Sequence, residues 1–320
     1  MVRVLVCIPH FFRRASSDTG LRNGSNFDSM ELRASQVSYS LKQIHAILGP
    51  VQFTLGTKGR IGNEILEAIP QTTQGDVIIV SVPGENLIDE LSDGGKLHAR
   101  LWSGPPRQLG YRCRHIFARY VGKYDLYCFI EDDTAITDPA FFRKVAKFYQ
   151  KHGEDKVLLP NRYEIFGFQA RGWRTYLDRP GFPRFRVPER PGRQTLKLKD
   201  FDGDVLFEKT RESQAGAYVI TDAQLRKWMV QPGFAAPSKA RLDAGYDPME
   251  LAMIAMDGLL PFYRPAKSNL DFLQVHHVPT LASMRKTPKS KLREYLQPML
   301  QKEREVWESE NDPRPKQDSE

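Results

Sequence analysis

The sequence YDLYCFIEDDT, from Tyr124 to Thr134, joins an apolar run to an abrupt acidic end. The run 126–130 is typical of a strand buried on both faces of a parallel sheet. Glu131, Asp132 and Asp133 follow at once, and adjacent carboxylates repel one another unless a cation or hydrogen-bond donors lie among them. Ligands of open α/β sheets bind beyond the carboxyl ends of the strands, so the triplet is a candidate site for a metal and a phosphate group. The alternative is a solvated acidic turn, since acidic residues are common in turns.

Apolar strand patterns alternate with amphipathic helix patterns on both sides of this stretch. Strands are expected at 2–8 (stopped by Pro9), 51–55, 76–82, 124–130, 157–160, 216–220 and 270–277, and helices at 30–48, 109–121, 141–149, 222–228 (capped by Asp222) and 248–256. This order predicts an α/β fold with three layers, α/β/α, and a mostly parallel central sheet.

The predicted domain organisation is one catalytic domain with an insertion and a tail. The domain covers 1–285, and its segment 161–211, rich in Arg, Pro, Gly and aromatic residues, is expected to form a long insertion or an acceptor-side hairpin. Residues 286–320 alternate in charge and are expected to form a helix followed by a disordered tail.

The net charge of the chain indicates which kinds of ligand or surface the protein could bind. The chain has 320 residues and a net charge of +8, which suits a polyphosphate ligand, an anionic acceptor or contact with an anionic membrane surface. We expect no nucleic-acid partner, since no zinc-finger spacing or basic-aromatic RNA-binding signature is present.

The cysteines and the apolar runs favour a cytoplasmic protein, peripheral to a membrane at most. Cys7, Cys113 and Cys128 lie far apart, and we expect buried free thiols in a reducing compartment. The apolar run at the N-terminus is too short for a signal peptide, and no run approaches the ~20 apolar residues that span a membrane.

Three further motifs follow the acidic strand in a fixed order. SQAGAY at 213–218 is a small-residue turn that leads into a strand, GYDPMEL at 245–251 opens a helix with acidic groups, and His276-His277 closes the core. With the carboxylate triplet, this order resembles the GT-A glycosyltransferases of the nucleotide-diphospho-sugar transferase superfamily. The resemblance covers roughly residues 2–280 and rests on an acidic motif after a strand, a glycine turn, an acidic helix start and a late histidine.

The resemblance implies a divalent cation, Mn²⁺ or Mg²⁺, at the triplet. Asp133 is the first choice as ligand, and Glu131, which shares its face on an extended backbone, is expected at the metal, its bound water or the nucleotide ribose. Asp132 also belongs to the expected nucleotide-sugar site, with the least determined role. Adjacent His276 and His277 point to opposite faces of a strand, so one of them is expected as a ligand, and its parity with Gln274 favours His276.

The remaining site residues are also implied by the resemblance. Asp247 with Glu250 would activate the acceptor hydroxyl, although a capping box beginning at Asp247 explains both residues as well. Further candidates for nucleotide-sugar binding are Pro9, His10, Phe11, Arg13 and Gly216, and candidates for acceptor binding are Arg162, Trp173 and Arg174. Alternatively, Gly216 is only the glycine of a turn. The arginines of the basic insertion are alternatively solvated side chains without a ligand.

The function implied is a metal-dependent glycosyltransferase of polysaccharide biosynthesis. It would move a hexose from a nucleotide diphosphate sugar to a polysaccharide or glycolipid acceptor, with inversion if Asp247 is the base. One alternative is a sugar-phosphate nucleotidyltransferase, but PHFFRR at 9–14 replaces the glycine-rich loop of those enzymes. The second alternative is a non-enzymatic protein that binds anionic polymers. The sequence has no G-x-x-x-x-G-K-[ST] or G-x-S-x-G motif.

Overall fold

The computed structural model describes residues 1–14, 26–27, 30–57, 63–91, 98–168, 171–177, 195–200, 203–210, 215–235, 259–278 and 301. The chain divides into two compact units, Met1–Val278 and Pro279–Glu320. Of the second unit only Gln301 is described, so the predictions for the charged tail lie outside the described residues. The helix predicted at 248–256 also lies outside them.

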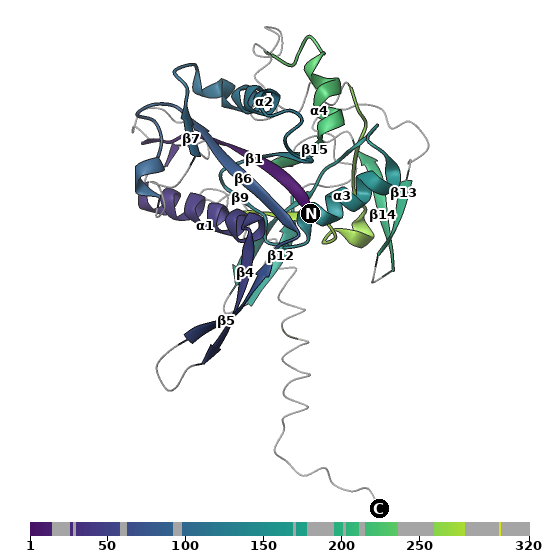
Figure 1. Ribbon diagram of the computed structural model, residues 1–320. Helices are drawn as coiled ribbons and strands as arrows, with labels where there is room; N and C mark the ends of the chain where they lie inside the picture. Colours follow the sequence, from purple (N-terminus) through teal and green to yellow (C-terminus); the bar gives the residue numbers. More distant parts are fainter. Residues whose placement is uncertain are drawn as a thin grey trace, which may run out of the picture. The chain divides into compact units, whose positions relative to one another are not determined.

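A five-stranded sheet forms the centre of the first unit (Figure 1). Its strand order is β15 (Ala217–Thr221), β8 (Leu126–Ile130), β1 (Val2–His10), β6 (Thr73–Ser81) and β7 (His98–Leu101). β1 pairs in parallel with both β8 and β6, and β6 pairs in parallel with β7. Only β15 runs antiparallel, against β8. The sheet is therefore mostly parallel, as predicted.

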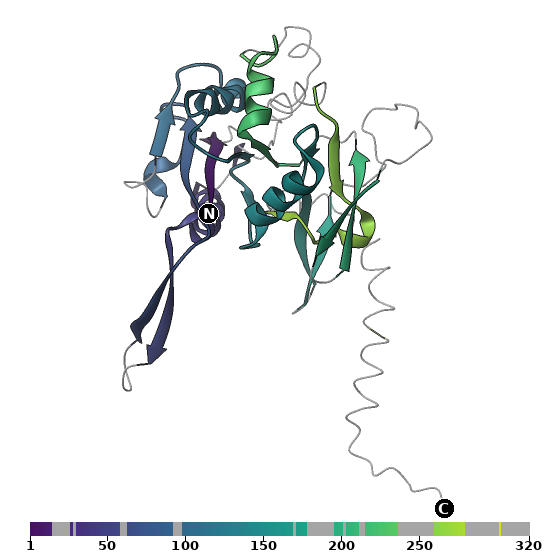
Figure 2. The same cartoon turned by 45° about the vertical axis from the view of Figure 1, so that its right-hand side comes forward.

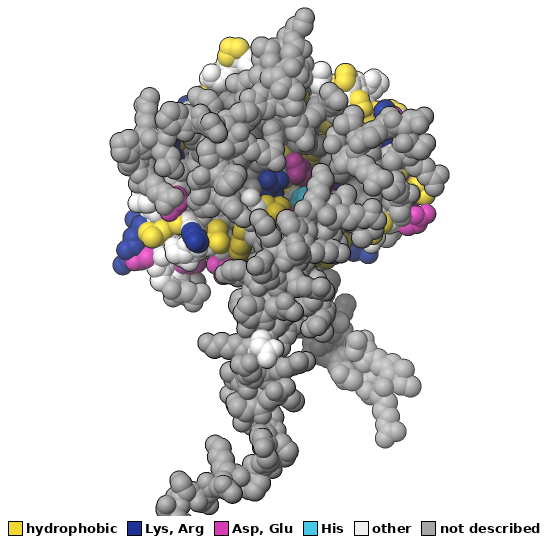
Figure 3. Space-filling view, turned by 180° about the vertical axis from the view of Figure 1, so that it is seen from behind, with side chains coloured by type: hydrophobic (Ala, Val, Ile, Leu, Met, Phe, Trp, Pro, Cys, Tyr) yellow, Lys and Arg dark blue, Asp and Glu magenta, His cyan; other side chains and the backbone are white. Residues whose placement is uncertain are grey.

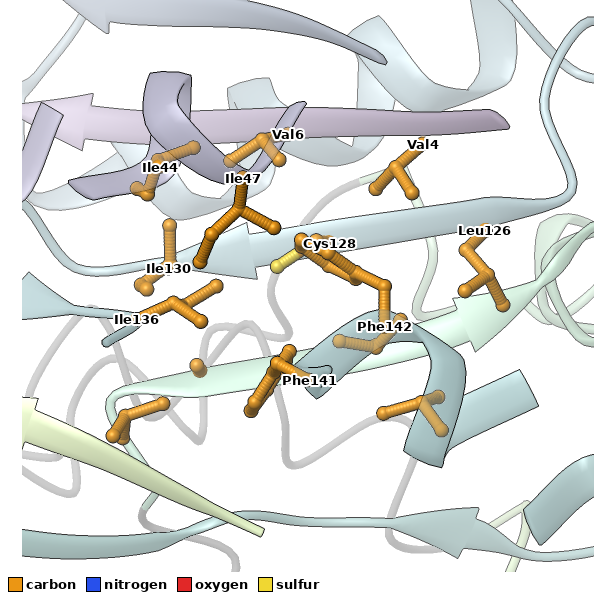
Figure 4. Packing of buried hydrophobic residues seen from close by; sticks show 14 of the residues in the cluster. Val4, Val6, Ile44, Ile47, Leu126, Cys128, Ile130, Ile136, Phe141 and Phe142 are labelled. Atoms are coloured by element: carbon orange, nitrogen blue, oxygen red, sulfur yellow. The ribbon is translucent and has the colours of Figure 1, made fainter. Parts of the chain in front are cut away.

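Helices cover both faces of this sheet. Val4 and Val6 of β1 pack with α1 (Met30–Leu48) and α3 (Phe141–His152), as Figure 4 shows. Alternate residues of the same strand, Leu5 and Cys7, pack with α2 (Leu109–Arg119) and α4 (Asp222–Met229) on the opposite face. Since successive strand residues point to opposite faces, the continuous apolar run of β1 is what two helical layers require. The three-layer α/β/α prediction is confirmed.

Two local predictions were wrong. β1 continues through Pro9 to His10 instead of stopping at residue 8. The strand tolerates this proline because β8 pairs with β1 only as far as Cys7, which leaves that side of β1 an edge. The N-cap of α4 is Thr221, whose capping box with Gln224 leaves Asp222 inside the helix.

Two four-stranded sheets extend the central one. Their orders are β10 (Val157–Leu158), β16 (Phe262–Pro265), β14 (Gly203–Thr210), β13 (Thr195–Asp200) in one, and β12 (Arg171–Tyr176), β11 (Asn161–Phe168), β17 (Gln274–His277), β9 (Thr134–Ala135) in the other. The described part of 161–211 thus forms two hairpins, β11–β12 and β13–β14, which belong to different sheets. The last predicted strand is shorter than 270–277 because it begins only at Gln274.

Short elements complete the unit. They are β2 (Arg13–Arg14) paired with β3 (Asn26–Phe27), the hairpin β4 (Val51–Thr57) with β5 (Asn63–Pro70), and the 3₁₀ turns η1 (Ile88–Glu90), η3 (Pro106–Gln108) and η4 (Lys267–Asn269). Cys7, Cys113 and Cys128 are buried free thiols, as expected. Among the described helices, none has the length and apolar character to cross a membrane.

Phe148 of α3 tests the packing of the core. Its ring is fully buried, and the centre of this ring lies 4.9 Å from the centre of the Phe207 ring. We expect Phe148→Ala to lower the free energy of unfolding by about 3–5 kcal/mol, because a cavity replaces these contacts. Val230→Ala is the control, since Val230 is 78% exposed and should change stability by less than about 0.5 kcal/mol. Equal urea midpoints for the two variants would contradict the packing described here.

Candidate active site

The acidic triplet forms a buried turn between two sheets. The N–H of Thr134 donates to the carbonyl of Glu131 at 3.1 Å, which closes a β-turn between β8 of the central sheet and β9 of the next. Asp132 is only 6% exposed and the side chain of Asp133 is 14% exposed. The turn considered from the sequence therefore exists, but Asp132 is buried, and Glu131 and Asp133 are only partly exposed.

Arg33 of α1 supplies the charge that this turn needs. Its guanidinium is fully buried and forms an ion pair with Asp132, while its Nη1 lies 3.6 Å from Asp133 Oδ2. Burial alone would lower the pKa of Arg33, but the charges of Asp132 and Asp133 outweigh it and raise that pKa. Burial would likewise raise the pKa of Asp132, but Arg33 and His10 lower it. Both groups are therefore charged at neutral pH.

His10, at the end of β1, holds Asp132 from the other side. Its Nε2 accepts the backbone N–H of Leu87 at 2.9 Å, so the ring proton lies on Nδ1 and is donated to Asp132 Oδ2 at 2.6 Å. His10 is fully buried with both nitrogens engaged. Its geometry is that of a residue that positions the turn.

The neighbours of His10 differ in their exposure. Pro9 is buried within β1 and Phe11 is half-buried. The guanidinium of Arg13 lies 5.5 Å from the centre of the Phe11 ring and pairs with Glu85. Among the residues predicted near the nucleotide base, Phe11 and Arg13 are those with accessible surface.

His277 faces the acidic turn. Its Nδ1 lies 2.9 Å from Glu164 Oε1, and its Nε2 lies 3.7 Å from Asp133 Oδ2. Burial would lower the pKa of His277, but the hydrogen bond to Glu164 and the charges of Asp133 and Glu131 raise it. The turn and β17 are also tied by the backbone, since the N–H of Val278 donates to the carbonyl of Asp133 at 2.7 Å.

His276 lies on the opposite face of the same strand. Its ring stacks on Tyr163, with centroids 5.0 Å apart, and burial lowers its pKa. Neither of its ring nitrogens has a hydrogen-bond partner in the described part of the chain. The sequence parity favoured His276 as the ligand, whereas the structure places His277 beside Asp133.

Gly216 lies against the acidic turn, immediately before β15. Its φ is +61°, and a Cβ there would lie 3.0 Å from Thr134 Oγ1 and 3.2 Å from Glu131 Oε2. Its carbonyl accepts the N–H of Glu131 at 2.8 Å. The glycine is therefore needed where the acidic turn approaches the backbone.

The predicted acceptor residues lie in the β11–β12 hairpin. Cδ of Arg162 would lie 3.1 Å from a Cβ at Gly216, so Arg162 borders the acidic turn. Arg174 instead has its Cζ 5.3 Å from the centre of the Tyr163 ring. Tyr163 stacks on His276, so this contact lies on the face of the sheet opposite to His277. The backbone of Trp173 pairs with Phe166, and its side chain lies outside the described part, as do Asp247 and Glu250.

Asp133 and His277 are the residues that could hold a divalent cation. The described residues contain no group of three or more His, Cys, Asp or Glu side chains arranged to hold a metal. Asp133 Oδ1, however, is buried and has no hydrogen-bond partner among them. Two ligands of one ion at bond lengths of about 2.1 Å lie roughly 3–4 Å apart, and the 3.7 Å between Asp133 Oδ2 and His277 Nε2 falls in this range. The pair fits a cation whose other ligands are water and phosphate oxygens.

Sequence reasoning missed two residues of the site, Arg33 and Glu164. Arg33 lies in line with Val37, Leu41 and Ile44 on the buried stripe of α1, and an arginine in such a stripe was a usable signal. Glu164 alternates with Arg162 on β11 and so shares its face. Figure 3 shows a Lys or Arg, an Asp or Glu and a His side chain side by side near the middle of the back face.

No family model and no curated protein matches this sequence. Among solved structures it is similar to TarS of S. aureus, with 10% identity, a TM-score of 0.43 and coverage of 87% of this chain and 37% of that one. A TarS 1–349 structure in complex with UDP-GlcNAc shows 12% identity and a TM-score of 0.38, over 86% of this chain and 58% of that one. CMP:2-keto-3-deoxy-manno-octonic acid synthetase complexed with CTP shows 11% identity and a TM-score of 0.39, over 92% of this chain and 100% of that one. The chain thus spans little more than a third of the first TarS structure and less than two thirds of the second.

Removing Arg33 should destabilise the whole unit. We expect Arg33→Met to lower the free energy of unfolding by about 3–5 kcal/mol, because Asp132 would remain as a buried carboxylate without its cation. Arg226→Met is the control, since its ion pair with Asp222 is exposed and worth about 0–1 kcal/mol. Adding Asp132→Asn to Arg33→Met should recover part of the loss, and chemical denaturation of the three variants would check this. Equal losses for Arg33→Met and Arg226→Met would contradict the pairing.

Gly216→Ala tests the close approach of the turn. Gly84 has a similar φ, +72°, but no atom of the described residues lies within 4 Å of a Cβ built there. Both substitutions to Ala should cost about 1–2 kcal/mol for the left-handed backbone, and Gly216→Ala should cost about 1–3 kcal/mol more for the contacts with Thr134 and Glu131. Thermal unfolding of the two variants measures the difference, and similar midpoints would rule out the crowding.

Proposed function

We propose that this protein is a metal-dependent glycosyltransferase that moves a hexose from a nucleotide diphosphate sugar to a saccharide or glycolipid acceptor. The observation that carries the proposal is the pair Asp133 and His277. Asp133, which has a buried oxygen with no hydrogen-bond partner among the described residues, faces a carboxylate-bound imidazole just beyond the carboxyl end of β8. Ligands of open α/β sheets bind at such an edge.

The arrangement around His277 supports a ligand role. In metal sites a histidine commonly donates its second ring N–H to a carboxylate, which fixes its tautomer and orientation. Glu164 is placed to accept from Nδ1, so that Nε2 is directed toward Asp133. When bound, the cation would supply positive charge to a diphosphate leaving group.

The three carboxylates of the triplet have different contacts, and this difference also supports the proposal. Asp132 is paired with the guanidinium of Arg33 and accepts a hydrogen bond from His10, and so maintains the turn. Asp133 keeps an oxygen without a described partner. Glu131 lies at Gly216 and Arg162, where it could contact the nucleotide ribose or metal-bound water.

We assign residues to the binding of the sugar donor and of the acceptor from their positions around the acidic turn. Phe11, half-buried after β1, offers a ring that could stack on the nucleotide base, and Arg13 beside it offers a charge for phosphate. Arg162 borders the turn and is proposed to contact an anionic acceptor or the phosphates. Asp247, the proposed base, lies outside the described residues.

Thermal-shift screening tests the donor and the metal together. With UDP-, GDP-, ADP- and CMP-sugars, we expect one class to raise the melting temperature in Mn²⁺ and to lose this effect when the metal is chelated. Asp133→Ala and His277→Ala should abolish the metal-dependent shift, while Asp155→Ala, which removes an exposed carboxylate, should retain it. A shift that is unchanged in Asp133→Ala would refute the proposed site.

Product analysis separates the proposal from a nucleotidyltransferase. A glycosyltransferase releases the nucleoside diphosphate when the sugar is transferred or hydrolysed. A nucleotidyltransferase would instead form pyrophosphate from a nucleoside triphosphate and a sugar phosphate. Pyrophosphate release that depends on a sugar phosphate would overturn the proposal.

A further inference from the structure

Thr134, the residue that follows the acidic triplet, carries a hydroxyl for which the described fold provides no partner. The residue is 0% exposed, and its Oγ1 forms no hydrogen bond within the described part of the chain. A valine would fill the same space on β9 without a polar atom to bury, and a buried hydroxyl without a partner costs free energy. The hydroxyl therefore requires an explanation other than packing.

The strand register places this hydroxyl on the face of the sheet that holds the candidate metal site. Thr134 pairs with His277 across β9 and β17, and paired residues of an antiparallel ladder project to the same face. Glu164 contacts His277 on that face, and Arg162 shares it because it lies two residues earlier on β11. Figure 2 shows β17, coloured yellow-green, beside the teal strands of this sheet. Thr134 thus lies on the face where the ring of His277 approaches Asp133.

The surroundings of Gly216 locate the hydroxyl independently of the register. A Cβ built at Gly216 would lie 3.0 Å from Thr134 Oγ1. The same Cβ would lie 3.2 Å from Glu131 Oε2 and 3.1 Å from Cδ of Arg162. Because one point lies this close to all three side chains, the hydroxyl is placed among the polar groups that border the acidic turn and not in the apolar core.

We propose that the hydroxyl of Thr134 is a positioning group that accepts a hydrogen bond from a water ligand of the divalent cation at Asp133 and His277. This inference rests on the proposed function, because it needs the cation of that site. Cations of this kind keep several water ligands when few protein side chains bind them. A hydroxyl has lone pairs that accept from such a water, and groups behind the ligands of a metal orient those ligands and raise its affinity.

Mn²⁺ binding by the full chain, followed through the electron paramagnetic resonance signal of free Mn²⁺, tests this role. The titration is made without nucleotide and repeated with UDP. In both we expect Thr134→Val to bind Mn²⁺ at least about tenfold more weakly, the usual loss when a group behind a metal ligand is removed. Thr134→Ser keeps the hydroxyl and should restore most of the affinity. Asp133→Ala, which removes the candidate ligand, identifies the share of binding that belongs to this site.

Thermal unfolding without metal separates this role from a structural one. Because the hydroxyl of Thr134 has no described partner, Thr134→Val should leave the melting temperature unchanged or raise it. Thr221→Val is the matched control, since Thr221 is also buried but its hydroxyl accepts the N–H of Gln224 at 3.2 Å. That variant should lower the melting temperature and bind Mn²⁺ like the unchanged chain.

Equal Mn²⁺ affinity of Thr134→Val and the unchanged chain would overturn this role of the hydroxyl and leave the site at Asp133 and His277 intact. Weaker binding together with a lower melting temperature of Thr134→Val would overturn it in favour of a structural role. A loss of affinity seen only with UDP would assign the hydroxyl to a phosphate oxygen and overturn the assignment to water. Mn²⁺ binding that is absent, or that does not depend on Asp133, would overturn the proposed metal site and this inference with it.

Discussion

The buried ion pair between Arg33 and Asp132 joins the parts of the molecule on which the candidate site depends. It links α1 to the turn that leaves the central sheet, and His10 ties the same carboxylate to the end of β1. A buried charge without a partner costs several kcal/mol, so these elements are held in one arrangement. The positive charge of Arg33 also offsets the negative charge of Asp132, which reduces its repulsion of Glu131 and Asp133.

The remaining carboxylates are held in position by a second set of contacts. Glu164 orients His277, the carbonyl of Asp133 accepts the N–H of Val278, and Gly216 admits the turn against β15. Four segments far apart in the sequence, the turn itself, β11, the start of β15 and the end of β17, thus meet at one place. Pre-organisation of this kind favours binding because little side-chain order is lost when a charged ligand arrives.

The sequence was sufficient for those features that depend on local periodicity. The helix predicted at 30–48 is confirmed, and β8 and β6 fall within or beside the predicted runs, because burial on one or two faces imposes a repeat on the sequence. The acidic triplet was found because it breaks such a run. The end of β1 was misjudged because the effect of Pro9 depends on which neighbouring strand is still paired there.

Features that depend on long-range contacts were not predictable in the same way. Arg33 and Asp132 are 99 positions apart, and nothing local to either residue identifies the other. The parity of Gln274 and His276 was real, since both are buried on one face, but the acidic turn lies on the other face beside His277. Which face of β17 meets the turn is decided by its pairing with β9, which the sequence pattern alone does not show.

A divalent cation is expected to bind between Asp133 and His277. Crystals soaked in MnCl₂ with a nucleoside diphosphate would locate Mn²⁺ by anomalous scattering. We predict one peak within bonding distance of Asp133 and of His277 Nε2, with the diphosphate oxygens completing its shell. A manganese peak elsewhere, or a nucleotide bound in full occupancy with no metal at Asp133, would contradict it.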